Sequence, residues 1–191
     1  MNAIVRPALV LFALLSALTG VVYPLAVTGI TQALFPAQAA GSLIVRDGKT
    51  IGSSLIGQSF SDPKYFWGRP SATSPMPYNA SSSGGSNLGP LNPALTDAVK
   101  ARIEALRVAD PGNAAAVPVD LVTTSGSGLD PHISVAAAQV QAQRVAKVRG
   151  LSMQQVQPLI DKHTEGQLLG LIGEPRDNVL RLNMALDAVR L

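Results

Sequence analysis

The sequence contains no cysteine, only two histidines and few charged residues. Without cysteine the chain can form neither a disulfide nor a zinc–thiolate site, and thiol catalysis is excluded. Charged residues make up 14% of the 191 residues, against roughly 25% in an average protein. The formal net charge is only +3, and the chain has no Lys/Arg run and no basic stripe flanked by aromatic residues. This charge pattern argues against a nucleic-acid partner.

Charged residues are scarcest near the N-terminus, where no Asp, Glu, Lys or Arg lies between Arg6 and Arg46. As a helix, the uncharged stretch 8–35 would be about 42 Å long, enough to cross a hydrocarbon core of roughly 30 Å. The alternative is a signal peptide cleaved after Ala39, since Ala37-Gln38-Ala39 has the small-x-small form. The apolar core of a signal peptide is usually about 7–15 residues, roughly half this stretch, so the length favours a membrane anchor.

Within the predicted span, Ser16 and Gly20 are small residues four positions apart, a spacing that lets membrane helices approach closely. Pro24 removes a backbone donor and is expected to kink the helix, and Thr28 adds a hydrogen-bonding group. These features predict contact with another membrane helix. The flanking charges specify orientation weakly. A cysteine-free body behind a short N-terminal stub favours a cytoplasmic N-terminus.

Residues 37–191 are predicted to form a small mixed α+β extracytoplasmic domain behind a transmembrane segment at 1–36. Asp47-Gly48 between two β-prone runs, within residues 42–57, predicts a hairpin. Residues 71–93 are predicted to be a loop, because 16 of these 23 positions are Ser, Gly, Pro or Asn.

Four further elements are predicted in the domain from apolar periodicity and capping residues. They are a helix at 93–108 capped by Asn92, a strand at 117–123, a helix from Ser134 or Asp130 to about 148, and a closing helix at 176–189. Ser152 and Gln155 form a capping-box pattern for one more helix, and 166–173 is read as a short apolar connection.

The candidate catalytic patterns are weak. Gly52-x-x-x-x-Gly57-Gln58-Ser59 lacks the lysine of a phosphate-binding loop and is read as strand and turn. Ser61-x-x-Lys64 has the spacing of a Ser–Lys nucleophile pair, which keeps a membrane-anchored hydrolase as an alternative. A cleaved, exported binding module is a third reading.

The histidines, His132 and His163, are 31 positions apart with no second ligand near either, so we predict no metal site and no catalytic residues. His132 is read as hydrogen-bonding a helix start and His163 as ending a helix.

Two groups of residues suggest contacts. Arg144, Lys147 and Arg149 lie on one predicted helix and are expected to form a solvated face, with a contact surface for an acidic partner as the alternative. Trp67 beside Arg69 in a Gly/Pro-rich segment indicates either recognition of a partner or a simply buried ring, and the sequence does not separate the two.

A set of longer motifs extends in one order over nearly the whole chain. The first is Thr19-Gly20-x-x-Tyr23-Pro24 in the predicted span. The others are 41–44 (GSLI), 54–58 (SLIGQ), 66–72 (FWGRPSA), 77–79 (PYN), 83–90 (SGGSNLGP), 117–123 (VPVDLVT), 127–134 (SGLDPHIS), 173–176 (GEPR) and 182–187 (LNMALD). Together they resemble the family of C subunits of the potassium-transporting Kdp ATPase, KdpC.

This resemblance implies a non-catalytic, single-span accessory subunit of a high-affinity, ATP-driven potassium importer of the bacterial inner membrane. The implied partners are a P-type ATPase subunit, a channel-like potassium-binding subunit and a small membrane subunit. The implied role is to support assembly and to raise the ATP affinity of the pump subunit as a catalytic chaperone. No firmly bound cofactor is expected; ATP would act through the complex, and potassium is the ion that the complex transports.

The resemblance also names candidate contact residues in three groups. The membrane helix contributes Ser16, Gly20, Tyr23, Pro24 and Thr28. The loop contributes Trp67, Arg69, Pro70, Tyr78 and Asn79, expected to dock on the channel-like subunit. The third group, Ser83, Gly84, Gly85, Ser86 and Asn87, has been likened to a nucleotide-contacting signature, although it contains no Lys or Arg.

Overall fold

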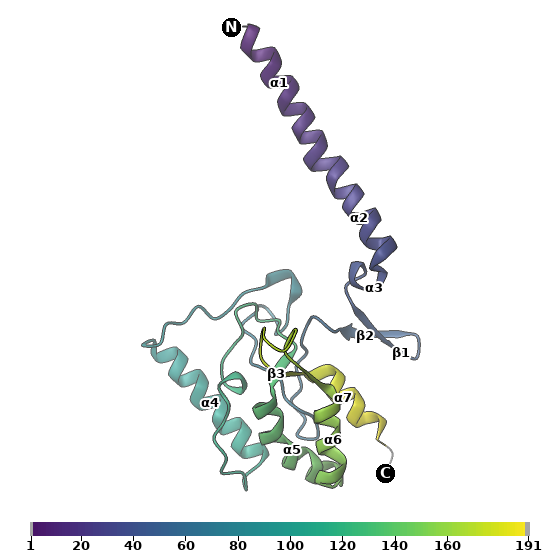
Figure 1. Ribbon diagram of the computed structural model, residues 1–191. Coiled ribbons are helices and arrows are strands. Elements are labelled where there is room, and N and C mark those ends of the chain that lie inside the picture. The colour runs from purple at the N-terminus through teal and green to yellow at the C-terminus, as the bar shows by residue number, and fades with distance from the viewer. Residues whose placement is uncertain (1, 190–191) are drawn as a thin grey trace. The chain divides into compact units, whose positions relative to one another are not determined.

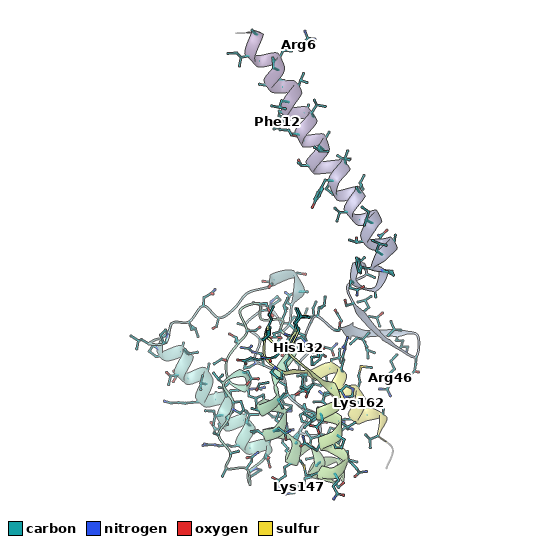
Figure 2. The ribbon with its side chains drawn as sticks, in the orientation of Figure 1. Arg6, Phe12, Arg46, His132, Lys147 and Lys162 are labelled. Carbon is teal, nitrogen blue, oxygen red and sulfur yellow. The ribbon has the colours of Figure 1, made fainter. Side chains whose placement is uncertain are left out.

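The computed structural model describes residues 2–189 and divides into two compact units, one ending at Ile51 and one beginning at Gly52 (Figure 1). The first unit contains a continuous helical rod made of α1 (Asn2–Ala17), η1 (Leu18–Val22) and α2 (Tyr23–Leu34), followed by α3 (Pro36–Ala39). Its stretch Ala3–Leu34 is long and apolar enough to cross a membrane, and an 18-residue window within it has a mean hydropathy of 2.2. Side chains such as Phe12 point outward from the rod (Figure 2). It is a candidate membrane span.

One turn of this rod is a π-helix. In η1 the Tyr23 N–H donates to the carbonyl of Leu18, five residues back rather than four. The widened turn directly precedes Pro24, which has no N–H and whose ring would collide with the carbonyl of Gly20 in a regular α-helix. A kink was predicted at Pro24; the structure has a π-turn just before it.

The hairpin predicted at Asp47-Gly48 is confirmed. Strands β1 (Leu43–Arg46) and β2 (Lys49–Ser53) pair with each other, and the two turn residues have φ of +50° and +73°. Positive φ at both positions is what a type I′ turn requires, and glycine tolerates it best.

The second unit is a mixed α+β domain, as predicted. Its elements are η2 (Ala80–Ser82), α4 (Pro93–Ala109), η3 (Val119–Leu121), β3 (His132–Ser134), α5 (Val135–Arg149), α6 (Met153–His163), β4 (Thr164–Glu165), β5 (Arg176–Asn178) and α7 (Val179–Ala188). Strand β5 lies between β3 and β4, antiparallel to both. Helix α6 contacts both α5 and α7 (Figure 1).

The core lies between these helices and the sheet. Helix α5 contributes a face of alanines, Ala137, Ala138, Ala142 and Ala146, which lets neighbouring side chains approach its backbone. The larger core residues are Phe66, Leu121, Ile133, Val145, Val156, Ile160, Leu182 and Leu186.

The predicted helix ends are largely confirmed. Ser134 caps α5 by accepting from the Ala137 N–H at 3.0 Å, and Gly150 ends the helix with φ of +68°. Asn92 caps α4, and Ser152 forms the predicted capping box with Gln155.

Two predicted elements are wrong. Residues 117–123 do not form a strand, because the carboxylate of Asp120 turns toward Ser134 and accepts from its N–H at 2.6 Å, leaving η3 in place of extended backbone. The closing helix does not begin at Arg176: residues 176–178 form β5, and Asn178 caps α7 by accepting from the Arg181 N–H.

Asp177, on the central strand β5, is a buried carboxyl group. Its Oδ1 accepts from the Thr164 hydroxyl at 3.0 Å, while its Oδ2 has no hydrogen-bond partner among residues 2–189. Burial raises the pKa of Asp177 above its ordinary value, and the carboxylates of Asp161 and Glu165 add to the rise. The folded chain therefore keeps this proton at pH values where the unfolded chain has lost it, so this group lowers the free energy of unfolding as the pH rises from 3.8 through the raised pKa.

We predict that Asp177→Asn weakens the fall in stability with rising pH, because the neutral amide keeps an acceptor for Thr164 and has no charge to bury. The measurement is chemical unfolding of the full chain in mild detergent, followed by circular dichroism between about pH 4 and pH 8. Asp97→Asn, an exposed change on α4, serves as the control. An unchanged pH dependence in the Asp177 variant would contradict this account.

Candidate functional site

The backbone of Phe66 and Trp67 is held by two buried amide side chains from distant helices. Gln141 of α5 accepts from the Trp67 N–H at 2.8 Å and donates to its carbonyl at 3.1 Å. Asn183 of α7 does the same for Phe66, at 2.9 and 3.0 Å. We call these two pairs the amide clamps. Each side chain pairs one backbone N–H and one backbone carbonyl, which in a strand would be paired by the neighbouring strand. Leaving these groups unpaired in the interior would lower the stability of the fold.

The Trp67 ring is buried, at 6% exposure, which decides between the two readings of this residue in favour of packing. The guanidinium groups of Arg102 and Arg144 lie over the ring, 5.3 and 4.9 Å from its centre. The indole Nε1 donates to the carbonyl of Asp62 at 3.0 Å. Cation–π contact and a satisfied indole together fix this ring.

The expectation of a solvated Arg144/Lys147/Arg149 face is wrong for two of the three residues. Arg144 is 3% exposed and donates to the carbonyls of Pro63 and Tyr65 and to the Gln141 side chain. Burial lowers the pKa of Arg144 to about 10, so it remains charged at neutral pH. Arg149 binds Asp187 at 2.7 Å, whereas Lys147 is exposed (Figure 2). Arg144 therefore organises the interior of the domain, and Arg149 forms an ion pair nearer its surface.

Arg69 is half-buried and is the first of a row of charged or titratable side chains that continues through Asp130 and His132 to Glu165. It lies 3.3 Å from the carboxylate of Asp130 and donates to the carbonyl of Thr124 at 3.2 Å. Burial alone would raise the pKa of Asp130, but the hydrogen bonds from the ring and N–H of His132, together with Arg69, hold it below its ordinary value. His132 also lies 3.7 Å from Glu165 on β4.

The predicted loop 71–93 is internally bonded. The Ser71 hydroxyl donates to the carbonyl of Gly128 at 2.7 Å and accepts from the Tyr78 N–H. The Tyr78 hydroxyl donates to the carbonyl of Arg69 at 2.6 Å, and a Cβ on Gly57 would overlap the Tyr78 ring. Asn79 caps η2. The loop therefore has a defined shape despite its composition.

The third predicted group, residues 83–87, packs against the turn at 124–128. The Gly84 N–H and the Ser83 hydroxyl donate to the carbonyl of Ser127, and the Thr124 hydroxyl donates to Ser86 at 3.2 Å. Pro70 and Ser86, from different predicted groups, line one groove of about 320 Å³ beside α4, whose walls are mainly apolar.

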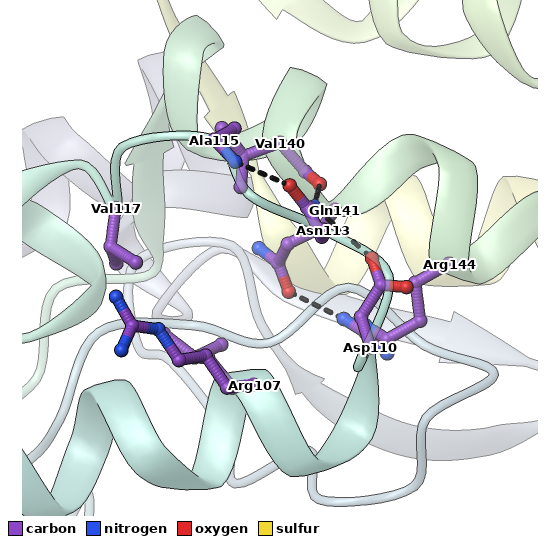
Figure 3. A pocket seen from close by; sticks show the side chains of 9 residues that line it. Arg107, Asp110, Asn113, Ala115, Val117, Val140, Gln141 and Arg144 are labelled. Carbon is purple, nitrogen blue, oxygen red and sulfur yellow. Dashed lines mark hydrogen bonds between the residues drawn. The ribbon is translucent and has the colours of Figure 1, made fainter.

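A separate small cavity beside α5 has no room for an organic ligand. Its volume is about 30 Å³, space for a water molecule or two (Figure 3). Arg107, Asp110, Asn113, Gln141 and Arg144 supply its polar lining, and Asn113 donates to Asp110 and to the carbonyl of Val140 (Figure 3).

The alternative catalytic patterns are not assembled as a Ser–Lys pair requires. Lys64 Nζ lies 3.2 Å from the carboxylate of Asp62, and no hydrogen bond joins it to Ser61. Gly52 lies in β2, where a Cβ would meet the side chains of Gln58 and Leu180. Among residues 2–189, no three His, Asp or Glu side chains are grouped as metal ligands.

In the membrane helix, the π-turn affects how the predicted contact residues line up. In an α-helix, residues four apart drift by about 40° around the axis. A turn closed over five residues rotates less per residue, so η1 offsets part of this drift for Ser16, Gly20, Pro24 and Thr28. Tyr23 lies beside this line. The widened turn thus keeps the line closer to one face.

Two comparisons with known proteins identify the family. The family model described as KdpC, K+-transporting ATPase, c chain, matches residues 5–188. Potassium-transporting ATPase KdpC subunits of Variovorax paradoxus (strain S110) and Polaromonas naphthalenivorans (strain CJ2) are 74% and 73% identical to this chain. The alignments cover 98% and 100% of this chain and 97% of each relative. The chain belongs to the KdpC family. The resemblance seen in the sequence is confirmed, and KdpC membership implies an accessory role in a potassium uptake complex.

Sequence reasoning missed the most constrained residues of this KdpC domain, the two clamp amides. A signal was present in the sequence. Gln141 lies on the same helix face as the buried alanines, and Asn183 lies between Leu182 and Leu186, so both are polar residues at positions where the helical periodicity predicts an apolar one. A polar residue in such a position is expected to have a specific buried partner.

We predict that Gln141→Leu destabilises the domain by about 2–5 kcal/mol, because a side chain of similar size leaves the N–H and carbonyl of Trp67 buried and unpaired. Chemical unfolding of the full chain in detergent measures the change. The matched control is Gln143→Leu, an exposed glutamine two positions away on α5, expected to fall within about 0.5 kcal/mol of wild type. Equal stability of the two variants would show that the clamp contributes nothing.

Proposed function

We propose that this chain is the non-catalytic accessory subunit of an ATP-driven potassium importer, which it helps to assemble and whose pump subunit it gives a higher ATP affinity. Its partners are a P-type ATPase subunit, a channel-like potassium-binding subunit and a small membrane subunit. The observation that carries the proposal is the match to KdpC over residues 5–188, together with relatives of nearly the same length. The helix Ala3–Leu34 anchors the chain in the bacterial inner membrane, with the body outside the cytoplasm.

The domain supports a docking role for residues 65–90. The amide clamps, the Ser71 bonds and the Arg69–Asp130 pair fix the shape of this segment before any partner binds. A surface that is already ordered loses less conformational entropy on association. We place the channel-like subunit against this segment. Residues 83–87 contribute through their packing against the turn at 124–128, and ATP acts through the pump subunit.

The proposal is tested by tagging the full-length chain, co-expressing it with its cognate partner subunits and purifying it in mild detergent. We expect a P-type pump subunit and a multi-span channel-like subunit to co-purify, identified by mass. In the purified complex, potassium-stimulated ATPase activity should reach half-maximum at a lower ATP concentration than in the same preparation lacking this chain. Recovery of the chain alone would refute the proposal, and an unchanged ATP dependence would remove its chaperone part.

Two glycines of the membrane helix provide a matched test of its role. A Cβ at either Gly20 or Gly29 would meet no atom of the described chain within 4 Å, so neither glycine is required by the chain's own packing. Gly29 directly follows Thr28, the last residue of the line through Gly20, and is turned about 100° away from it, so Gly29 lies off the face that carries Gly20.

Gly20→Leu should lower the recovery of partner subunits several-fold, because a large side chain there keeps a partner helix from approaching closely. Gly29→Leu should leave recovery unchanged. The yield of co-purified subunits per tagged chain measures both. Equal yields from the two variants would show that the Gly20 face is not an interface.

A further inference from the structure

The segment that joins β4 to β5 exposes four large apolar side chains in a row. This apolar hairpin, residues 166–173, presents Leu168, Leu169, Leu171 and Ile172 at 65%, 84%, 85% and 62% exposure. Elsewhere after Ile51, the exposed large apolar residues of the described chain are spread singly along the sequence. Single exposed apolar residues are ordinary, whereas a contiguous group marks a binding surface.

The apolar hairpin has a defined shape. Leu168 and Ile172 exchange two backbone hydrogen bonds, at 2.9 and 3.1 Å, and the Gln167 side chain donates to the carbonyl of Gly173 at 2.8 Å. Leu169 has a φ of +54°, a conformation that L-residues other than glycine rarely adopt. The turn therefore holds Leu169 in an unfavourable backbone conformation, although no other part of the described domain buries its side chain.

The surroundings of the hairpin favour a protein partner over a lipid surface. Residues 166–173 contain no Trp, Tyr, Lys or Arg, the residue types that hold a segment at a membrane interface. At its base, Glu165 lies 3.5 Å from Arg176 and 3.6 Å from Arg181, so the rim carries both signs of charge and offers little attraction to anionic headgroups. An apolar centre with a polar rim is the composition of a protein–protein interface.

We propose that the apolar hairpin inserts into an apolar socket on another subunit of the potassium-transporting ATPase complex. The socket would be ringed by polar groups that complement Glu165, Arg176 and Arg181. This inference rests on the proposed function, because it requires that the chain assembles with partner subunits. It adds a second contact surface, separate in sequence from the segment 65–90.

The absence of cysteine makes the hairpin directly testable, since a single introduced thiol is the only one in the chain. The probe is a charged maleimide, and the labelling of Leu171→Cys is followed by the mass of this chain. Rates are compared for the full chain in the purified complex and for the full chain alone in phosphatidylethanolamine/phosphatidylglycerol vesicles. Val108→Cys on α4, at a site 73% exposed and outside the segment 65–90, is the reference in each state.

We expect Leu171→Cys to react at least about tenfold more slowly than Val108→Cys in the complex, because an interface core excludes water. In vesicles without partners, the two sites should react at similar rates. Leu171→Asp should also lower the recovery of partner subunits, whereas Val108→Asp should not.

Each other outcome overturns the inference in a distinct way. Slow labelling of Leu171→Cys in vesicles without partners would assign the hairpin to lipid or to a second copy of the chain. Fast labelling in the complex would show that the hairpin is not covered by another subunit, while the accessory role stands. If the wild-type chain recovers no partner subunits at all, the proposed function fails and this inference fails with it.

Discussion

The fold of the second unit depends on hydrogen bonds to the N–H and carbonyl groups of two consecutive residues that belong to no sheet. Phe66 and Trp67 enter the core as irregular chain, and their N–H and carbonyl groups are paired by Asn183 and Gln141. With these pairs in place, the Trp67 ring can lie beneath two arginines, and Arg69 is positioned to reach Asp130. The clamps also tie α5 and α7 to the same short segment, so helix packing and loop shape are one cooperative arrangement.

Features governed by neighbours in sequence were predictable. The hairpin at Asp47-Gly48, the caps of α4 and α5 and the capping box of α6 all follow from residues within four positions of each other. The failures arise where a distant partner decides the conformation. Asp120 bonds Ser134, which removes the predicted strand at 117–123, and β5 forms because two other strands flank residues 176–178.

The candidate site shows the same division. The sequence indicated that the segment around Trp67 is important, and its motifs identified the family, but they did not show what the residues contact. Gln141 is 74 positions from Trp67 and Asn183 is 117 from Phe66, so local patterns indicate that each amide is buried but not which backbone groups it pairs with. Arg144 was expected in solvent because charged side chains usually are; it is buried because three acceptors and an aromatic ring surround it.

The way Arg144 is held has a consequence for the conditions that the protein can tolerate. Its acceptors are two backbone carbonyls and an amide oxygen, none of which gains or loses a proton in ordinary media. An arginine paired with a carboxylate would be released when acid neutralises that carboxylate, and a surface ion pair weakens as salt is added. The hydrogen bonds of Arg144 have no titrating acceptor, and the carboxylates of Asp110 and Asp62 act on its guanidinium only through their charge. In a domain proposed to face the outside medium, the hydrogen bonds around Arg144 thus do not depend on protonation, whereas those of the buried Asp177 carboxyl do.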